Sequence, residues 1–154
     1  MSDPAPLPPK PVPDADTQPF WDGVVERRLL VQRCSSCGDW IWQPRPLCPR
    51  CHQPDPEWTE LSGDGTVASW TVIHPPVLPV WQDVVPFVLL LVELEGAPMV
   101  RMVGQLVDEA GERLHADDGV DFGARVRLVW RTDEAGQVLP AWSLESDAPS
   151  ETGG

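Results

Sequence analysis

The sequence is poor in basic residues and contains no tyrosine. Lysine and arginine together number 11 against 24 acidic residues, which gives a net charge of −13, and Lys10 is the single lysine. A charge of this sign repels phosphate backbones, so binding of nucleic acid through a broad basic surface is disfavoured. A small anionic ligand held by a few arginines remains compatible with it. The eight tryptophans supply large apolar surfaces that suit cores and interfaces alike.

Long apolar runs are also missing. The longest run, Pro86 to Val92, is far too short to span a bilayer. The N-terminus is acidic and rich in proline, without the basic and apolar regions of a signal peptide. We therefore expect a cytoplasmic protein with no membrane partner. In that compartment, closely spaced cysteines favour metal ligation over disulfides.

Signatures of catalysis are absent as well. The sequence has no G-x-S-x-G, no P-loop and no Rossmann glycine pattern. Its three histidines are His52, which follows a cysteine, and His74 and His115, which fall in expected loops. We interpret all three as surface residues, with a weaker reading of His74 as a ligand contact. The sequence thus names no catalytic residue, and we do not expect the chain to be an enzyme by itself.

The four cysteines give the strongest signal. They form two Cys-x-x-Cys pairs separated by ten residues: Cys34 with Cys37, and Cys48 with Cys51. Each pair can form a turn that directs two thiolates at one point, and four sulfurs in a tetrahedron suit structural zinc. Iron in a rubredoxin-like site is the alternative metal. The haem-attachment pattern that ends at His52 is rejected, because it would leave the first cysteine pair unused.

The first third of the chain reads as a tail, a helix and the metal-binding ribbon. Residues 1–16 hold six prolines and predict a disordered tail. Thr17 is placed to cap a short amphipathic helix from Gln18 to Arg27. The ribbon extends from Leu29 to Leu61, so that residues 17–61 form one helix-and-ribbon unit.

The pattern changes at Gly63 to that of a mainly β domain over residues 62–145. The expected strands are Thr66–Ile73, Phe87–Leu94, Met99–Leu106, Arg125–Arg131 and Val138–Leu144. Five antiparallel strands in about 80 residues predict a Greek-key barrel of the OB type, with an SH3-like barrel as the alternative. Gly104 is predicted to mark a β-bulge. Residues 146–154 are expected to be a second disordered tail.

Four further residues are weak candidates for contact with a ligand or a partner. Trp40 and Trp42 alternate with Ile41 on a short predicted strand, and Arg45 lies between two prolines that restrain its backbone. Arg101 lies on a predicted strand amid apolar residues. For the two arginines, the competing interpretation is a surface charge above a buried stem.

The order of these motifs resembles the DUF35 family over residues 17–144. The matching elements are Phe20-Trp21, Leu30 before Cys34-x-x-Cys37-Gly38, Pro44-Arg45 before Cys48-Pro49-x-Cys51, Glu57-Trp58, Ser62-Gly63-x-Gly65-x-Val67-x-Ser69-Trp70-Thr71, Pro86-Phe87 and Gly123-x-x-Val126. The family often shows Pro-Pro-Arg before the third cysteine, where this chain has Gln43-Pro44-Arg45. The departure is small.

This resemblance implies a rubredoxin-like zinc ribbon followed by an OB-fold, with structural Zn²⁺. It also implies a non-catalytic subunit of a hetero-oligomer, whose partner is a thiolase-like enzyme such as an aldolase, or a MaoC-like hydratase. Acyl-CoA would be shared with that partner, in steroid side-chain or lipid degradation. Without a fused hydratase domain the sequence resembles the stand-alone form. A single-stranded nucleic-acid binder is the alternative from another class, because ribbons and OB barrels also serve that role.

Overall fold

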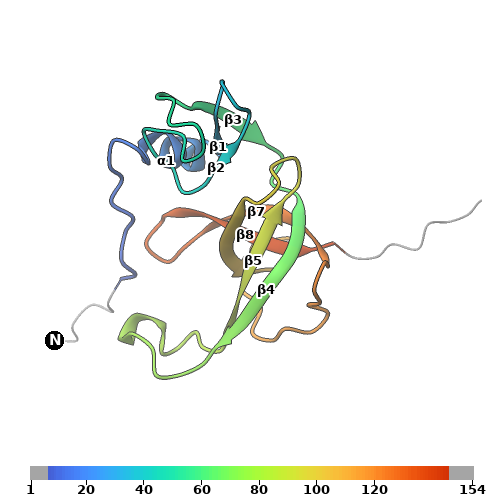
Figure 1. The fold of residues 1–154 in the computed structure, drawn as a ribbon. Helices are drawn as coiled ribbons and strands as arrows, with labels where there is room; N and C mark the ends of the chain where they lie inside the picture. Colours follow the sequence, from blue (N-terminus) through green and yellow to red (C-terminus); the bar gives the residue numbers. More distant parts are fainter. Residues whose placement is uncertain (1–6, 146–154) are drawn as a thin grey trace, which may run out of the picture.

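The computed structural model describes residues 7–145. Of the tails predicted for residues 1–16 and 146–154, residues 1–6 and 146–154 therefore lie outside the described residues. Within them, a short helix and a three-stranded sheet sit above a closed five-stranded barrel (Figure 1). No helix in this range is both long and apolar enough to cross a membrane.

Helix α1 spans Gln18–Val25 and ends before the predicted Arg27. The reason is local, because Arg27 adopts a left-handed backbone with φ of 59° that does not continue a helix. Thr17 occupies the N-cap position as predicted, but its side chain makes no hydrogen bond to the helix. Instead its hydroxyl accepts a hydrogen bond from the Asp14 N–H at 3.0 Å, and its own N–H donates to Asp14 Oδ1 at 2.8 Å. Together Asp14 and Thr17 close the turn that leads into α1.

The ribbon is an antiparallel sheet in the order β2-β1-β3. Its strands are β1 (Leu29–Arg33), β2 (Trp40–Ile41) and β3 (Glu57–Leu61). The buried Gln32 on β1 accepts a hydrogen bond at 2.8 Å from the backbone N–H of Arg45. This bond ties the loop between the two cysteine pairs to the middle of the sheet.

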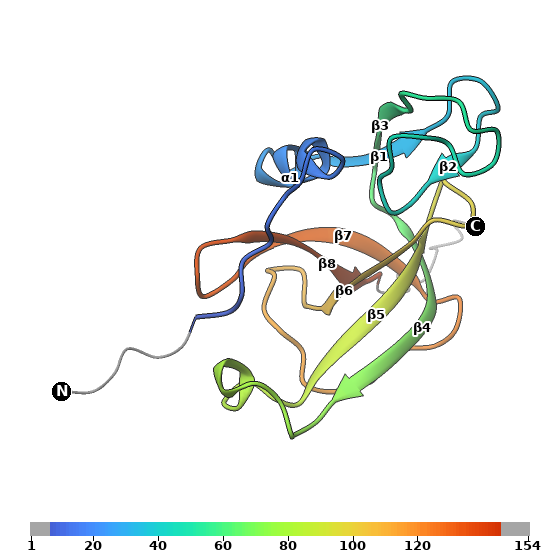
Figure 2. The ribbon, with the colours of Figure 1, turned by 60° about the vertical axis from the view of Figure 1, so that its left-hand side comes forward.

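The barrel confirms the predicted five-stranded OB-type architecture. Its strands are β4 (Gly65–Ile73), β5 (Phe87–Leu94), β6 (Arg101–Leu106), β7 (Arg125–Thr132) and β8 (Val138–Leu144). They close in the order β4-β5-β6-β8-β7 (Figure 2). The prediction of five antiparallel strands was wrong for one pair, since β6 and β8 run parallel at Gln105/Ala141 and Leu106/Trp142. The long connection after β6 and the β7–β8 hairpin allow this pairing, because parallel neighbours need a crossover rather than a tight turn.

The predicted bulge at Gly104 was also wrong. Gly104 stays in register opposite Leu90, and the irregularity lies on β4 between Val67 and Ser69. A Cβ on Gly104 would lie 2.4 Å from two ring atoms of Trp142. The glycine therefore leaves room for the largest fully buried side chain of the core. Besides a bulge, such a close approach by another group is the usual reason for a glycine in a strand.

One continuous core joins the helix and ribbon to the barrel. It includes Phe20 of α1, Leu29 and Val31 of β1, and barrel residues such as Leu90 and Trp142. The cysteine end of the ribbon has only a small separate cluster, formed by Cys34, Ile41 and Cys48 with Cys51 packed against it. That end cannot rely on apolar burial and depends on the chemistry of its sulfurs.

Candidate metal centre and adjoining groove

The two cysteine pairs form the same turn twice. The N–H of Gly38 donates to the carbonyl oxygen of Cys34 at 2.9 Å, and the N–H of His52 donates to that of Cys48, also at 2.9 Å. Both donors have a left-handed backbone, with φ of 75° for Gly38 and 59° for His52. The sequence predicted this conformation for the glycine but gave His52 only a surface role. Its position directly after a Cys-x-x-Cys pair was the signal for the backbone role.

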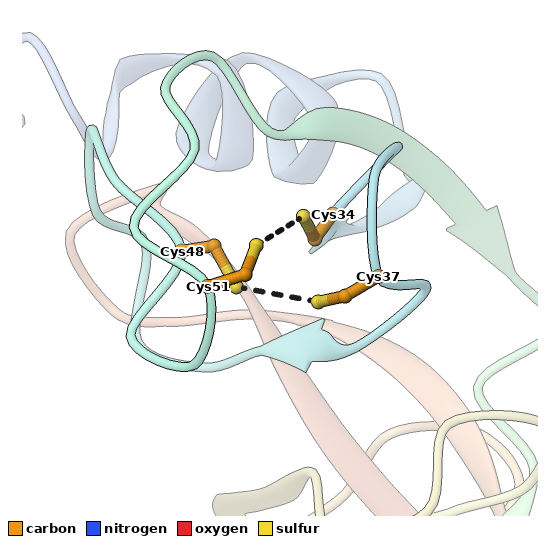
Figure 3. Close-up of side chains that lie close together, drawn as sticks. All are labelled: Cys34, Cys37, Cys48 and Cys51. Atoms are coloured by element: carbon orange, nitrogen blue, oxygen red, sulfur yellow. Dashed lines mark hydrogen bonds between the residues drawn. The ribbon is translucent and has the colours of Figure 1, made fainter.

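The two turns face each other and bring all four sulfurs together (Figure 3). Cys34 Sγ and Cys51 Sγ lie 3.5 Å apart, Cys37 Sγ and Cys48 Sγ lie 3.7 Å apart, and all four lie within 4.8 Å of one another. A tetrahedron of sulfurs about 2.3 Å from a zinc ion has edges of about 3.8 Å. A disulfide would need about 2.05 Å. The donor set therefore fits a four-coordinate metal ion, as the cysteine spacing predicted.

The electrostatics of the site also call for a cation. Backbone N–H groups, that of Cys37 first and that of Ser36 next, point at the Cys34 sulfur and lower the pKa of its thiol to about 6. An N–H from Asp39 acts in the same direction on Cys37, but desolvation and the neighbouring sulfurs outweigh it and raise the pKa of Cys37 to about 12. The Cys34 thiolate therefore forms readily, whereas the pKa values of Cys37 and Cys51 are raised. A divalent cation removes this conflict, because four thiolates then share its charge.

The histidines do not join the metal site. His52 and His74 are exposed, and His115 donates from Nδ1 to the carbonyl oxygen of Pro86 at 2.7 Å. With all four ligands supplied by cysteine, the centre offers no open position for water or substrate. Such a closed site is structural rather than catalytic.

The four weak contact candidates separate into two groups. Trp42 and Arg101 both line a groove beside the ribbon. The ring of Trp42 packs edge-on against Phe20 with centroids 5.0 Å apart, and Arg101 pairs with Glu93 at 3.1 Å.

The other two candidates lie away from the groove lining. The guanidinium of Arg33 lies over the Trp40 ring, 5.2 Å from its centroid. The side chain of Arg45 is exposed. The structure thus brings Trp42 and Arg101 to one cavity and leaves Trp40 and Arg45 on the ribbon.

The groove has a volume of about 840 Å³ and takes its walls from several segments of the fold. The apolar lining comes from α1, the residue that follows β2, the 74–86 loop and the barrel, and includes Trp21, Trp42, Trp81, Leu89, Val103 and Leu139. Pro8 and Pro9 also line the groove. The N-terminal stretch passes beside the β7–β8 hairpin (Figure 2).

Two arginines of the groove were missed by sequence reasoning. The side chains of Arg113 and Arg131 are only 10% and 12% exposed, and both pair with Glu134, at 3.2 and 3.0 Å. Desolvation opposes ionisation of Glu134, but its own backbone N–H and the two guanidiniums lower the pKa of this carboxyl. No local signal distinguished these arginines, since one lies in a polar connection and the other alternates with exposed arginines on β7.

Comparisons with known proteins agree with this geometry. The family model described as "ChsH2, rubredoxin-like zinc ribbon domain" matches residues 21–57, and "ChsH2, C-terminal OB-fold domain" matches residues 58–131. A "DUF35 domain-containing scaffold protein" of Methanocaldococcus jannaschii is 32% identical over 72% of this chain and 74% of its own length. The "3-oxo-4,17-pregnadiene-20-carboxyl-CoA hydratase alpha subunit" of Mycobacterium tuberculosis is 34% identical over 92% of this chain.

The lengths of these relatives differ. The chain spans 40% of the hydratase alpha subunits that it matches. Among solved structures, the "Ltp2-ChsH2(DUF35) aldolase" gives a TM-score of 0.74 at 31% identity, covering 88% of this chain and 98% of that chain. The ribbon, the barrel and these likenesses together show that the chain belongs to the DUF35 family.

Proposed function

We propose that this chain is a non-catalytic, zinc-binding subunit that assembles with a thiolase-fold enzyme and helps it to bind or channel acyl-CoA. The partner is an aldolase, a thiolase or an acyltransferase of steroid side-chain or lipid degradation. The observation that carries the proposal is the likeness to the DUF35-containing aldolase structure over 88% of the chain. The closed sulfur site supports it, because the chain's own metal centre offers no position for substrate chemistry.

The metal in this proposal is structural Zn²⁺ held by Cys34, Cys37, Cys48 and Cys51, with iron as the less favoured ion. When bound, the metal supplies a cross-link between the two turns and neutralises their thiolates. The residues of the chain do the rest. The backbone N–H groups at the turns orient the sulfurs, and the left-handed residues Gly38 and His52 set the direction of each turn.

We further propose that Trp40, Trp42, Arg45 and Arg101 contribute to the contact with the partner or with its acyl-CoA. Arg45 lies on the exposed side of the ribbon on a backbone held by the bond to Gln32. Arg45→Glu and Arg101→Glu should each weaken complex formation at least tenfold, whereas Arg50→Glu serves as the control. Arg50 is an exposed arginine of the same ribbon whose nearest carboxylate, on Asp39, is 3.6 Å away. Equal loss in all three variants would contradict the assignment.

The decisive experiment is co-expression of the chain with a thiolase-fold enzyme of the same genome. We expect a stable complex on size exclusion, and a higher kcat/KM for acyl-CoA in the complex than for the enzyme alone. The purified chain should show no turnover of the same thioester. Failure to form any complex with a thiolase-like partner would count against the proposal. Turnover by the chain alone, abolished by a point change, would replace it with an enzymatic function.

A second candidate function is the subunit of a MaoC-type enoyl-CoA hydratase complex. The 34% identity to the hydratase alpha subunit of Mycobacterium tuberculosis favours it. Co-expression with a MaoC-type hydratase in place of the thiolase-fold enzyme separates the two candidates. Binding of single-stranded nucleic acid is opposed by the charge of −13, and salt-dependent binding of an oligonucleotide at micromolar concentration would be needed to support it.

A further inference from the structure

We propose that the groove binds a small molecule with an apolar body and a carboxylate head, and that Arg113 and Arg131 receive the head. The two guanidiniums converge on one point of the groove. Nitrogen Nη2 of Arg113 lies 3.2 Å from Oε1 of Glu134, and Nη2 of Arg131 lies 3.0 Å from the same oxygen. The structure therefore already contains a carboxylate oxygen between the two arginines. A ligand carboxylate fits the same position.

These arginines have hydrogen-bonding capacity that the protein leaves unused. A guanidinium carries five N–H donors. Within residues 7–145, Arg131 makes its one side-chain hydrogen bond to Glu134, and Arg113 adds a longer one of 3.4 Å to Gln105 Oε1. None of their nitrogens is fully buried without a partner in that range, so the remaining donors keep access to solvent, and both residues line the groove. Asp133 does not use them, because its carboxylate accepts from Ala135 and Gln137 of the hairpin turn.

The charge of the lining favours an anion. Among the lining residues, Arg101 is already paired with Glu93 at 3.1 Å, whereas Arg113 and Arg131 share the single carboxylate of Glu134, which leaves one positive charge in excess at this pair. The whole chain, in contrast, carries −13. Glu134 is about half exposed, so its side chain is free to rotate away when a ligand carboxylate arrives. Charge-assisted pairs of this kind are the stronger class of hydrogen bond.

The remaining walls suit an apolar body. Leu78 and Val103 border the groove, and their side chains remain 56% and 58% exposed. Trp21, Trp42 and Trp81 add large flat surfaces. A volume of about 840 Å³ falls in the range of sites that take ligands of drug size. The occupant is thus an alkyl or fused-ring monocarboxylate. The free carboxylate distinguishes this ligand from an acyl-CoA thioester, although the groove shares Trp42 and Arg101 with the acyl-CoA contact proposed above.

Isothermal titration calorimetry of the full chain with laurate, below its micelle-forming concentration, tests the proposal. Dodecanamide is the uncharged match. We expect laurate to bind at least tenfold more tightly than dodecanamide, and Arg131→Gln to weaken laurate at least tenfold. Glu134→Gln removes the competing carboxylate and should tighten laurate several-fold. Arg127→Gln is the matched control, because Arg127 lies on the same strand with an exposed side chain outside the groove lining.

Arg131→Gln and Glu134→Gln are expected to change the affinity for laurate in opposite directions. Damage to the fold would instead weaken laurate binding in both variants, so the pair separates ligand recognition from folding. Arg113→Gln replaces Arg131→Gln if the latter does not fold. Absence of laurate binding, equal binding of dodecanamide, or weakening by Glu134→Gln would overturn the proposal. Dodecyl phosphate that binds tenfold more tightly than laurate would also overturn it, in favour of a phosphate head. None of these outcomes depends on the partner enzyme.

Discussion

Removal of the metal should unfold the cysteine end of the ribbon and leave the barrel folded. Apart from cysteines, the buried cluster at that end contains only Ile41. Burying one isoleucine contributes about 2 kcal/mol, whereas structural zinc contributes about 10–16 kcal/mol in zinc-finger peptides. The metal therefore dominates the stability of the two turns. The barrel belongs to the large core around Leu90 and Trp142, which is separate from the cysteine cluster, and does not need the metal to stay closed.

Limited trypsin digestion measures this difference at single peptide bonds. Arg50 lies inside the second turn, and Arg127 lies on β7 of the barrel. After chelation, cleavage after Arg50 should accelerate about a hundredfold or more, because cleavage follows the population of the locally opened state. Cleavage after Arg127 should change little. Cys48→Ser, which removes a buried ligand, should reproduce the effect of the chelator.

Elemental analysis supplies the control, with one zinc or iron expected per chain. Folded protein that contains neither metal would refute the assignment of the site. Unchanged cleavage after Arg50 in chelated protein would show instead that the turns are held by packing and hydrogen bonds. Loss of the barrel together with the cysteine end would contradict the separation of the small cysteine cluster from the large core.

Three further outcomes are expected. Gly104→Ala should lower the free energy of unfolding in urea by about 2–3 kcal/mol, because the new Cβ would lie 2.4 Å from the buried Trp142 ring. The control Gly136→Ala, at a position with φ of 77° and open space around it, should lower it by about 1 kcal/mol. Equal losses in the two variants would contradict the clash. Phe20→Ala should cost about 3–5 kcal/mol by opening the joint between α1 and the barrel, and a cost below about 1 kcal/mol would refute that joint. NMR should show that Glu134 titrates with a pKa below that of an ordinary carboxyl. Its ion pairs therefore stabilise the fold fully at a pH above the ordinary carboxyl pKa, and this stabilisation is lost as the pH falls through the lower pKa of the folded state. An unshifted titration would argue against the ion pairs.

The features that the sequence predicted well are encoded by neighbours along the chain. The four cysteines needed only their spacing, because a Cys-x-x-Cys turn directs two sulfurs whatever surrounds it. Strands β5 and β8 were predicted at their observed bounds, since apolar runs and turn residues are local signals. The bounds of α1 were less accurate because one residue, Arg27, ends it through its backbone conformation.

The features that the sequence did not predict depend on distant partners. A glycine in a strand indicates either a β-bulge or the close approach of another group, and only the position of the Trp142 ring against Gly104 decides between the two. The parallel pairing of β6 with β8 follows from closure of the barrel, which no local pattern records. Arg131 shares the alternation of the exposed Arg125 and Arg127, yet packing at the end of the hairpin buries it. The groove was therefore missed, since its charged residues come from segments far apart in the chain.

The ribbon connects the proposed metal site to the groove that we propose as a binding site. The first cysteine turn leads directly into β2, and β2 is followed by Trp42, which packs on Phe20 and lines the groove. Phe20 belongs to the same core as the barrel strands. A bound metal would fix the turns, the first turn would fix β2, and Trp42, which follows β2, lines the groove together with the arginines of the barrel. A scaffold needs this rigidity, because a ligand or a partner that touches both parts gains affinity only when their separation is set in advance.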